Sequence, residues 1–145
     1  MTDEDILNVH RLTEKDLYTL DAKREVVRSY IDLETSEAIF STPEGKMQAI
    51  DSILGAGIIA KEDTARLECL GTILGDVFVD DLGFHWVVVD DEIGRDFAIM
   101  YKETGVVVYP LTLISKRIQK GDTVDVYSLY HGLVKQVQER VKNSG

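Results

Sequence analysis

The spacing of apolar residues changes at Gly83 from that of helices to that of strands, and it becomes helical again after Pro110. Before this glycine, apolar residues recur every three or four positions, as they do on one face of a helix. After it comes Phe84–Val89, a run of β-branched and aromatic residues that is typical of a strand. A chain in which helices and strands are segregated in this way folds as α+β, not as an alternating parallel α/β protein. We therefore expect an α+β fold.

Helical spacing predicts three helices before Gly83. Their expected ranges are about Glu14 to Ile31, Thr42 to Gly55 and Glu62 to Gly83. The first begins with a capping box between Thr13 and Asp16, and the second has a proline in its first turn. The stretches around Ser36 and Gly57 are expected to be short loops.

The remainder of the chain predicts a small sheet followed by helices. The expected strands are Phe84–Val89, Phe97–Tyr101 and Val106–Tyr109. The short turns between them imply an antiparallel meander with helices over one face. Trp86 alternates with Phe84 and Val88, so we expect it to be largely buried. A short helix after Pro110 and a final helix capped by Asp125 bring the total to about four to five helices.

Length and composition limit the class of protein. A chain of 145 residues is a common size for one domain, so residues 1–145 are expected to form one, with a helical part to about residue 82. The one cysteine, Cys69, excludes an intramolecular disulfide and a cysteine-rich zinc site. Met1–Asp5 is acidic where a secretory signal is basic, and no apolar run reaches the roughly 20 residues that cross a bilayer. We expect a cytoplasmic protein with no membrane contact, metal or cofactor.

The net charge of −10 argues against nucleic acid as a partner, because phosphate binding depends on Lys and Arg. A basic protein partner is the better expectation. Residues 97–145 are the one third of the chain in which Lys and Arg outnumber Asp and Glu, so a local basic patch there is compatible with the overall charge.

The densest polar cluster runs from Asp90 to Asp96, at the tip of the first hairpin. Its carboxylates could bind a hard cation or do acid–base work, with Arg95 holding an anion, although the spacing does not match a calcium loop. The alternative is a solvated turn in which Arg95 pairs with neighbouring acids.

A second polar cluster, Thr112–Arg117, follows the third strand and contains the best anion-binding candidate of the chain, Ser115-Lys116-Arg117. Direct adjacency of Ser115 and Lys116 is not the spacing of a Ser-Lys nucleophile. The alternative is a helix whose basic residues face water. Gly71 and Gly75, spaced four apart on the third helix, indicate close packing against the sheet or another helix.

A meander brings the end of its third strand toward the tip of its first hairpin. We therefore expect one contiguous surface made of Asp91, Glu92, Arg95, Asp96, Ser115, Lys116 and Arg117. The favoured function is a non-catalytic binding or protein-interaction module. The alternative is a small hydrolase or metal-assisted enzyme that uses the carboxylates of Asp90–Asp96 with Lys116 or Arg117 as electrophile.

Three segments together resemble a bacterial family, the domain of unknown function 3806. They are Leu70–Asp76, Trp86–Asp96 and Pro110–Arg117. The likeness covers about residues 70–137 and not the first sixty. It implies a bacterial cytoplasmic protein, and because that family carries no agreed activity, it implies no catalytic roles for particular residues.

Overall fold

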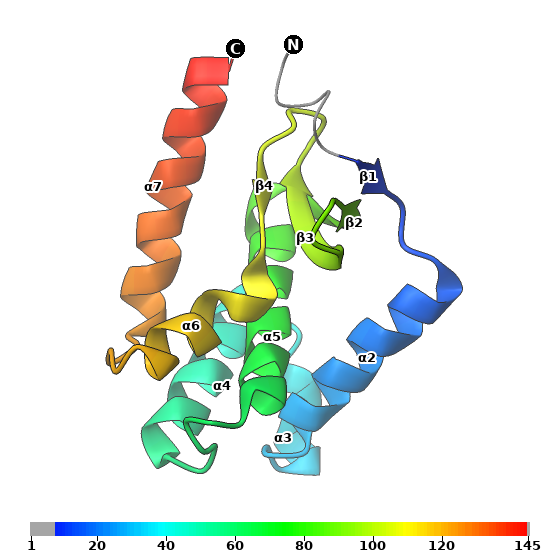
Figure 1. Ribbon diagram of the computed structural model, residues 1–145. Helices are drawn as coiled ribbons and strands as arrows, with labels where there is room; N and C mark the ends of the chain where they lie inside the picture. The colour runs from blue at the N-terminus through cyan, green and yellow to red at the C-terminus, as the bar shows by residue number, and fades with distance from the viewer. Residues whose placement is uncertain (1–7, 145) are drawn as a thin grey trace.

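The computed structural model describes residues 8–144, so the acidic Met1–Asp5 segment lies outside the described part (Figure 1). Within that part no helix is long and apolar enough to span a bilayer. The elements, in chain order, are β1 (Val9–His10), α2 (Glu14–Arg28), α3 (Leu33–Ile39), α4 (Pro43–Ala56), α5 (Thr64–Leu82), β2 (Phe84–Asp90), β3 (Arg95–Tyr101), β4 (Val107–Val108), the 3₁₀ turn η1 (Pro110–Thr112), α6 (Leu113–Gln119) and α7 (Val126–Ser144).

The strands form one antiparallel sheet in the order β1-β2-β3-β4. The expected meander is therefore confirmed as β2-β3-β4, and the fold is α+β. The short strand β1 was not expected. It consists of two residues, and its pairing of Val9 with Val89 depends on a contact far along the chain, which a local pattern does not reveal.

The helix α5 is the centre of the molecule (Figure 1). Along it Leu70, Ile73 and Leu74 are fully buried. It packs against the helices α2, α4 and α6, the 3₁₀ turn η1, and the strands β2 and β3. Burial on nearly all sides explains why this helix reads as apolar over almost its whole length.

The close packing expected at Gly71 and Gly75 is confirmed, and the structure shows its partners. A Cβ atom on Gly71 would lie 2.4 Å from the carbonyl oxygen of Leu111, and one on Gly75 would lie 2.6 Å from the ring of Trp86. The missing side chains thus allow η1 and the Trp86 indole to pack directly on the α5 backbone.

The helix boundaries differ from expectation at three places. The capping box of Thr13 and Asp16 is present, but α2 ends at Arg28 and not near Ile31. In α4 the C-cap is Gly57, whose φ of 66° is left-handed, and not Gly55. The stretch around Ser36 is the short helix α3, not a loop, and Asp32 caps its first turn. Seven residues are too few to show a helical period in the sequence.

Trp86 is partly buried, and its indole lies against Gly75 of α5. Its Nε1 donates a hydrogen bond of 2.9 Å to Oδ1 of Asp76, a buried carboxylate on α5. The same carboxylate accepts two hydrogen bonds from Arg24 of α2, at 2.7 and 2.8 Å. These bonds to Asp76 raise the pKa of Arg24. Asp76 therefore ties α2 and the sheet to the central helix.

Candidate binding site

The tip of the β2–β3 hairpin is closed by Asp91. Its Oδ1 accepts hydrogen bonds from the backbone N–H groups of Ile93 and Gly94, at 2.9 and 3.0 Å. Its own N–H donates to the carbonyl of Gly94. The carboxylate of Asp91 therefore shapes the turn, as an Asx-turn does.

Arg95, at the start of β3, pairs with a residue far away in the sequence. Its Nη1 and Nη2 donate to Oδ1 and Oδ2 of Asp16 at 2.8 and 2.6 Å. Hydrogen bonds from Arg95 and from the Thr13 backbone hold the pKa of the buried Asp16 well below its ordinary value of 3.8. For a solvated turn, Arg95 was expected to pair with neighbouring acids. It instead forms an ion pair with Asp16, which joins the hairpin to the first turn of α2.

Beside the ion pair of Arg95 and Asp16 lies a groove of about 630 Å³, which we call the hairpin groove. It is lined by Thr19, Lys23, Glu68, Asp91, Arg95, Asp96, Phe97, Tyr109, Leu111, Thr112 and Lys116. Its walls come from α2, α5, the β2–β3 hairpin and the segment from Tyr109 to α6. The pKa of Tyr109 at this wall is raised above its ordinary value, mainly by burial and secondly by the negative charges of Asp91 and Asp96. The groove is thus formed where segments distant in sequence meet.

Four charged side chains of the hairpin groove have no hydrogen-bond or ion-pair partner among residues 8–144. They are Lys23, Glu68, Asp96 and Lys116. Two are cationic and two anionic, and they stand on four different elements. Charges that the fold does not pair remain available to a ligand.

The structure brings together four of the seven residues expected to form one surface. Asp91, Arg95, Asp96 and Lys116 line the hairpin groove. The other three do not. Glu92 is exposed but is not part of the lining, and Ser115 is 2% exposed with its hydroxyl donating to the carbonyl of Thr112. Arg117, one residue beyond Lys116 on α6, faces another groove.

Sequence reasoning missed Lys23, Glu68 and Tyr109 in the hairpin groove. Lys23 and Glu68 lie on helices whose polar faces resemble any solvated surface. The one signal that could have indicated Tyr109 is its place just before Pro110, where the strand has to turn into the next helix.

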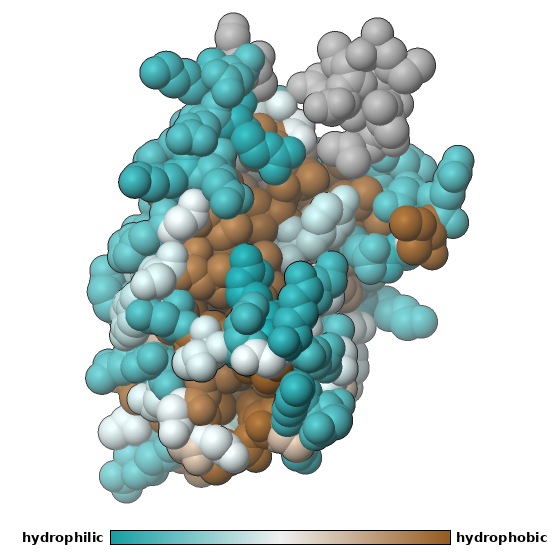
Figure 2. All heavy atoms as spheres, turned by 60° about the vertical axis from the view of Figure 1, so that its left-hand side comes forward, coloured by the Kyte–Doolittle hydropathy of each residue, from teal (hydrophilic) through white to brown (hydrophobic). Residues whose placement is uncertain are grey.

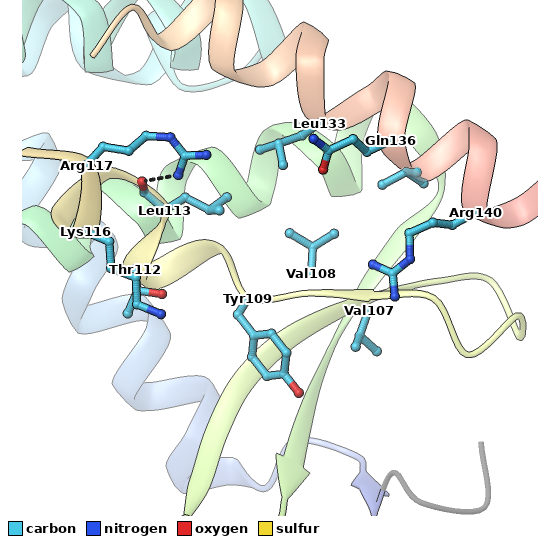
Figure 3. A pocket seen from close by; sticks show the side chains of 11 residues that line it. Val107, Val108, Tyr109, Thr112, Leu113, Lys116, Arg117, Leu133, Gln136 and Arg140 are labelled. Carbon is cyan, nitrogen blue, oxygen red and sulfur yellow. Dashed lines mark hydrogen bonds between the residues drawn. The ribbon is translucent and has the colours of Figure 1, made fainter. Parts of the chain in front are cut away.

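A smaller groove of about 240 Å³, the strand–helix groove, lies between β4, α6 and α7. Its lining residues are Val107, Val108, Tyr109, Thr112, Leu113, Lys116, Arg117, Leu133, Gln136, Val137 and Arg140. Figure 2, which turns the α7 side forward, shows a band of apolar atoms flanked by hydrophilic side chains on this face. In Figure 3 Val108 points toward α7, and the Arg140 guanidinium reaches from α7 toward β4.

The two grooves share one wall. Tyr109, Thr112 and Lys116 line both of them. Arg117 lies on the side of the strand–helix groove, and its Nη1 donates to the carbonyl of Leu113 at 2.9 Å. Among the described residues, no group of three or more His, Cys, Asp or Glu side chains is placed to hold a metal ion. Cys69 is a buried free thiol whose pKa is raised by burial.

The structure thus has an α+β fold with two adjoining surface grooves. The model of the family described as Domain of unknown function (DUF3806) matches residues 46–130, more than half of the chain. The chain belongs to this family. The match begins earlier than the resemblance that starts near Leu70, and it ends before Val137. It therefore includes most of α4 and only the first part of α7.

A crystal structure of a protein from Bacteroides thetaiotaomicron VPI-5482 has a similar fold, with a TM-score of 0.76 at 13% sequence identity. The similarity covers 90% of this chain and 48% of that one, so this chain spans about half the length of that protein. No curated protein matches the sequence significantly.

Proposed function

We propose that this domain is a non-catalytic binding module and that the hairpin groove is its recognition site. The observation that carries the proposal is the set of charges that this groove leaves unpaired, Lys23 and Lys116 against Glu68 and Asp96. Charges held at fixed positions in a concave site select a ligand by complementarity. A ligand that carries both signs fits this arrangement.

The ligand that fits best is a segment of a protein partner. A net charge of −10 attracts a basic protein to the surface over long range. An acidic group on the same segment would then meet Lys23 or Lys116 in the groove. A cytoplasmic location goes with this proposal, since Cys69 is a free thiol and a reducing compartment keeps it so.

The positions of the polar residues give less support to a hydrolase. The carboxylate of Asp91 is hydrogen-bonded within its turn, and Arg95 is paired with Asp16. The hydroxyl of the buried Ser115 donates to a backbone carbonyl. A general base or nucleophile has to reach a substrate atom, and these groups already have structural partners.

Affinity capture from an extract of the native cells tests the proposal. The wild-type chain is compared with Lys23→Glu and Asp96→Lys, which reverse one charge each in the hairpin groove, and with Lys135→Glu, an exposed control on α7 outside both grooves. We expect both groove variants to bind the captured partner about tenfold or more weakly, which corresponds to about 1.4 kcal/mol. The control should bind like the wild type. Equal capture by all four proteins would refute the proposal.

A further inference from the structure

We propose that the strand–helix groove binds an extended acidic peptide, which adds as a strand to the free edge of β4. This site adjoins the hairpin groove and shares Tyr109, Thr112 and Lys116 with it, but the ligand differs from the one proposed there. The inference rests on the backbone of β4, the charge of the rim and the size of the groove.

The backbone of Val107 is directed toward the edge of the sheet. Tyr101 N–H donates to the carbonyl of Val106 at 3.0 Å, so this pair of residues is a hydrogen-bonded pair. Antiparallel pairs alternate, and the next pair, Met100 with Val107, is therefore one whose N–H and C=O groups point away from each other. Since β4 is the last strand in the order of the described sheet, the outward N–H and C=O of Val107 face no further strand.

The residue that carries these outward groups is largely buried. Val107 is only 9% exposed, and no hydrogen bond from its outward groups to the residues 8–144 is found. A buried backbone group without a partner costs free energy, so an added strand that pairs with it gains main-chain hydrogen bonds. β-Strand addition is the binding mode that uses this kind of edge.

The rim of the groove selects for negative charge. Lys116, Arg117 and Arg140 line it, and no Asp or Glu does. The side chains of Lys116 and Arg140 have no ion-pair or hydrogen-bond partner in the described part of the chain. In a protein with a net charge of −10, a site whose charged lining residues are all cationic is a local exception that complements an acidic ligand.

Size and lining favour an extended peptide over a compact molecule. The volume of about 240 Å³ is below the range of roughly 300–1,000 Å³ in which drug-sized ligands are enclosed. A strand needs little width, and its side chains alternate. Apolar side chains can therefore pack on Val108, Leu133 and Val137 while acidic ones face the cationic rim.

A titration followed by amide NMR on the full chain tests the proposal. The probe is a short peptide of alternating Glu and Val. We expect the largest shifts at the amides of Val107 and Tyr109, and about tenfold weaker binding by Arg140→Glu, while Lys135→Glu binds like the wild type. Shifts centred elsewhere, or equal binding by Arg140→Glu, would overturn the proposal.

A pair of variants at one position isolates the backbone contribution. Val107→Pro removes the outward N–H, and an edge strand tolerates it because this N–H does not bond to β3. Val107→Ala trims the side chain and keeps the N–H. We expect Val107→Pro to bind the peptide at least about tenfold more weakly than Val107→Ala. Equal affinities of the two variants would contradict strand addition.

Two further probes exclude simpler ligands. A peptide of alternating Lys and Val should not bind, and acetate should not reproduce the shifts of the Glu-Val peptide. If acetate does so at equal carboxylate concentration, the site is one for small anions and the proposal is wrong. Lys23→Glu, which alters only the hairpin groove, should leave peptide binding unchanged, so this test and that of the proposed function can fail independently.

Discussion

The carboxylate of Asp16 on α2 accepts hydrogen bonds from two different parts of the chain. It closes the capping box with Thr13, whose backbone N–H donates to it at 2.8 Å, and it holds both terminal nitrogens of Arg95. The carboxylate is buried while the guanidinium is partly exposed. Because the hydrogen bonds favour the charged form, the pKa of Asp16 is lowered in the folded chain.

This lowered pKa predicts how stability depends on pH. A carboxylate with a depressed folded pKa contributes stability above its ordinary pKa of 3.8, and the contribution is lost as the pH falls below that value toward the folded pKa. We expect Asp16→Asn to be less stable than the wild type at pH 7 and the difference to shrink at pH 3. Urea denaturation at both pH values measures it. An unchanged difference would show that Asp16 titrates alike in both states.

At the scale of the elements, the backbone of η1 packs on α5 where Gly71 has no side chain. The carbonyl oxygens of Pro110 and Leu111 lie 2.5 and 2.4 Å from where a Cβ of Gly71 would be. Backbone atoms cannot move aside as the end of a flexible side chain can. This contact also sets the position of the segment that carries Thr112 and Lys116, the shared wall of the two grooves.

Gly71→Ala should therefore destabilise the fold by about 1–3 kcal/mol, in spite of the higher helix propensity of alanine. The matched control is Gly132→Ala on α7, where a Cβ would meet no atom within 4 Å. The control should leave the free energy of unfolding unchanged or raise it by up to about 1 kcal/mol. Denaturant unfolding of both variants checks this, and equal effects would contradict the steric argument.

At the scale of the whole molecule, Asp76 joins the helical layer to the sheet. Its carboxylate binds Arg24 of α2 and Trp86 of β2 from the central helix α5. Arg24 also contacts Asp21, one turn away on the same helix and largely exposed. Asp76 is buried and accepts two hydrogen bonds from this guanidinium, whereas Asp21 is largely exposed and accepts one.

Removing the buried carboxylate leaves Arg24 and the Trp86 N–H without this partner, so Asp76→Ala should lower the free energy of unfolding by about 3 kcal/mol or more. Asp21→Ala removes an exposed ion pair and should cost less than about 1 kcal/mol. Denaturant unfolding with tryptophan fluorescence reports both, since the indole is itself in the network. A cost for Asp76→Ala as small as that for Asp21→Ala would mean that water replaces the buried contact.

The sequence determined the local features of this protein. The helical spacing before Gly83, the cap at Thr13 and the β-branched runs predicted α2, α4, α5 and the β2-β3-β4 meander, because these signals act between residues a few positions apart. The spacing of Gly71 and Gly75 likewise indicated a close approach. The short elements α3 and β1 were not predicted, since neither is long enough to show a periodic spacing of apolar residues.

The tertiary structure decided which charged residues meet. Local sequence marked the hairpin tip and Ser115-Lys116-Arg117 as polar, but the backbone rotation of about 100° per helical residue turns Ser115 inward. Lys116 lies on the wall that the two grooves share, and Arg117 lines the strand–helix groove but not the hairpin groove. Arg95 finds Asp16, and Asp96 shares a groove with Lys23, only because the sheet packs beside α2 and α5. Such contacts arise from chain folding over long sequence separations, so no local pattern of residue types contains them.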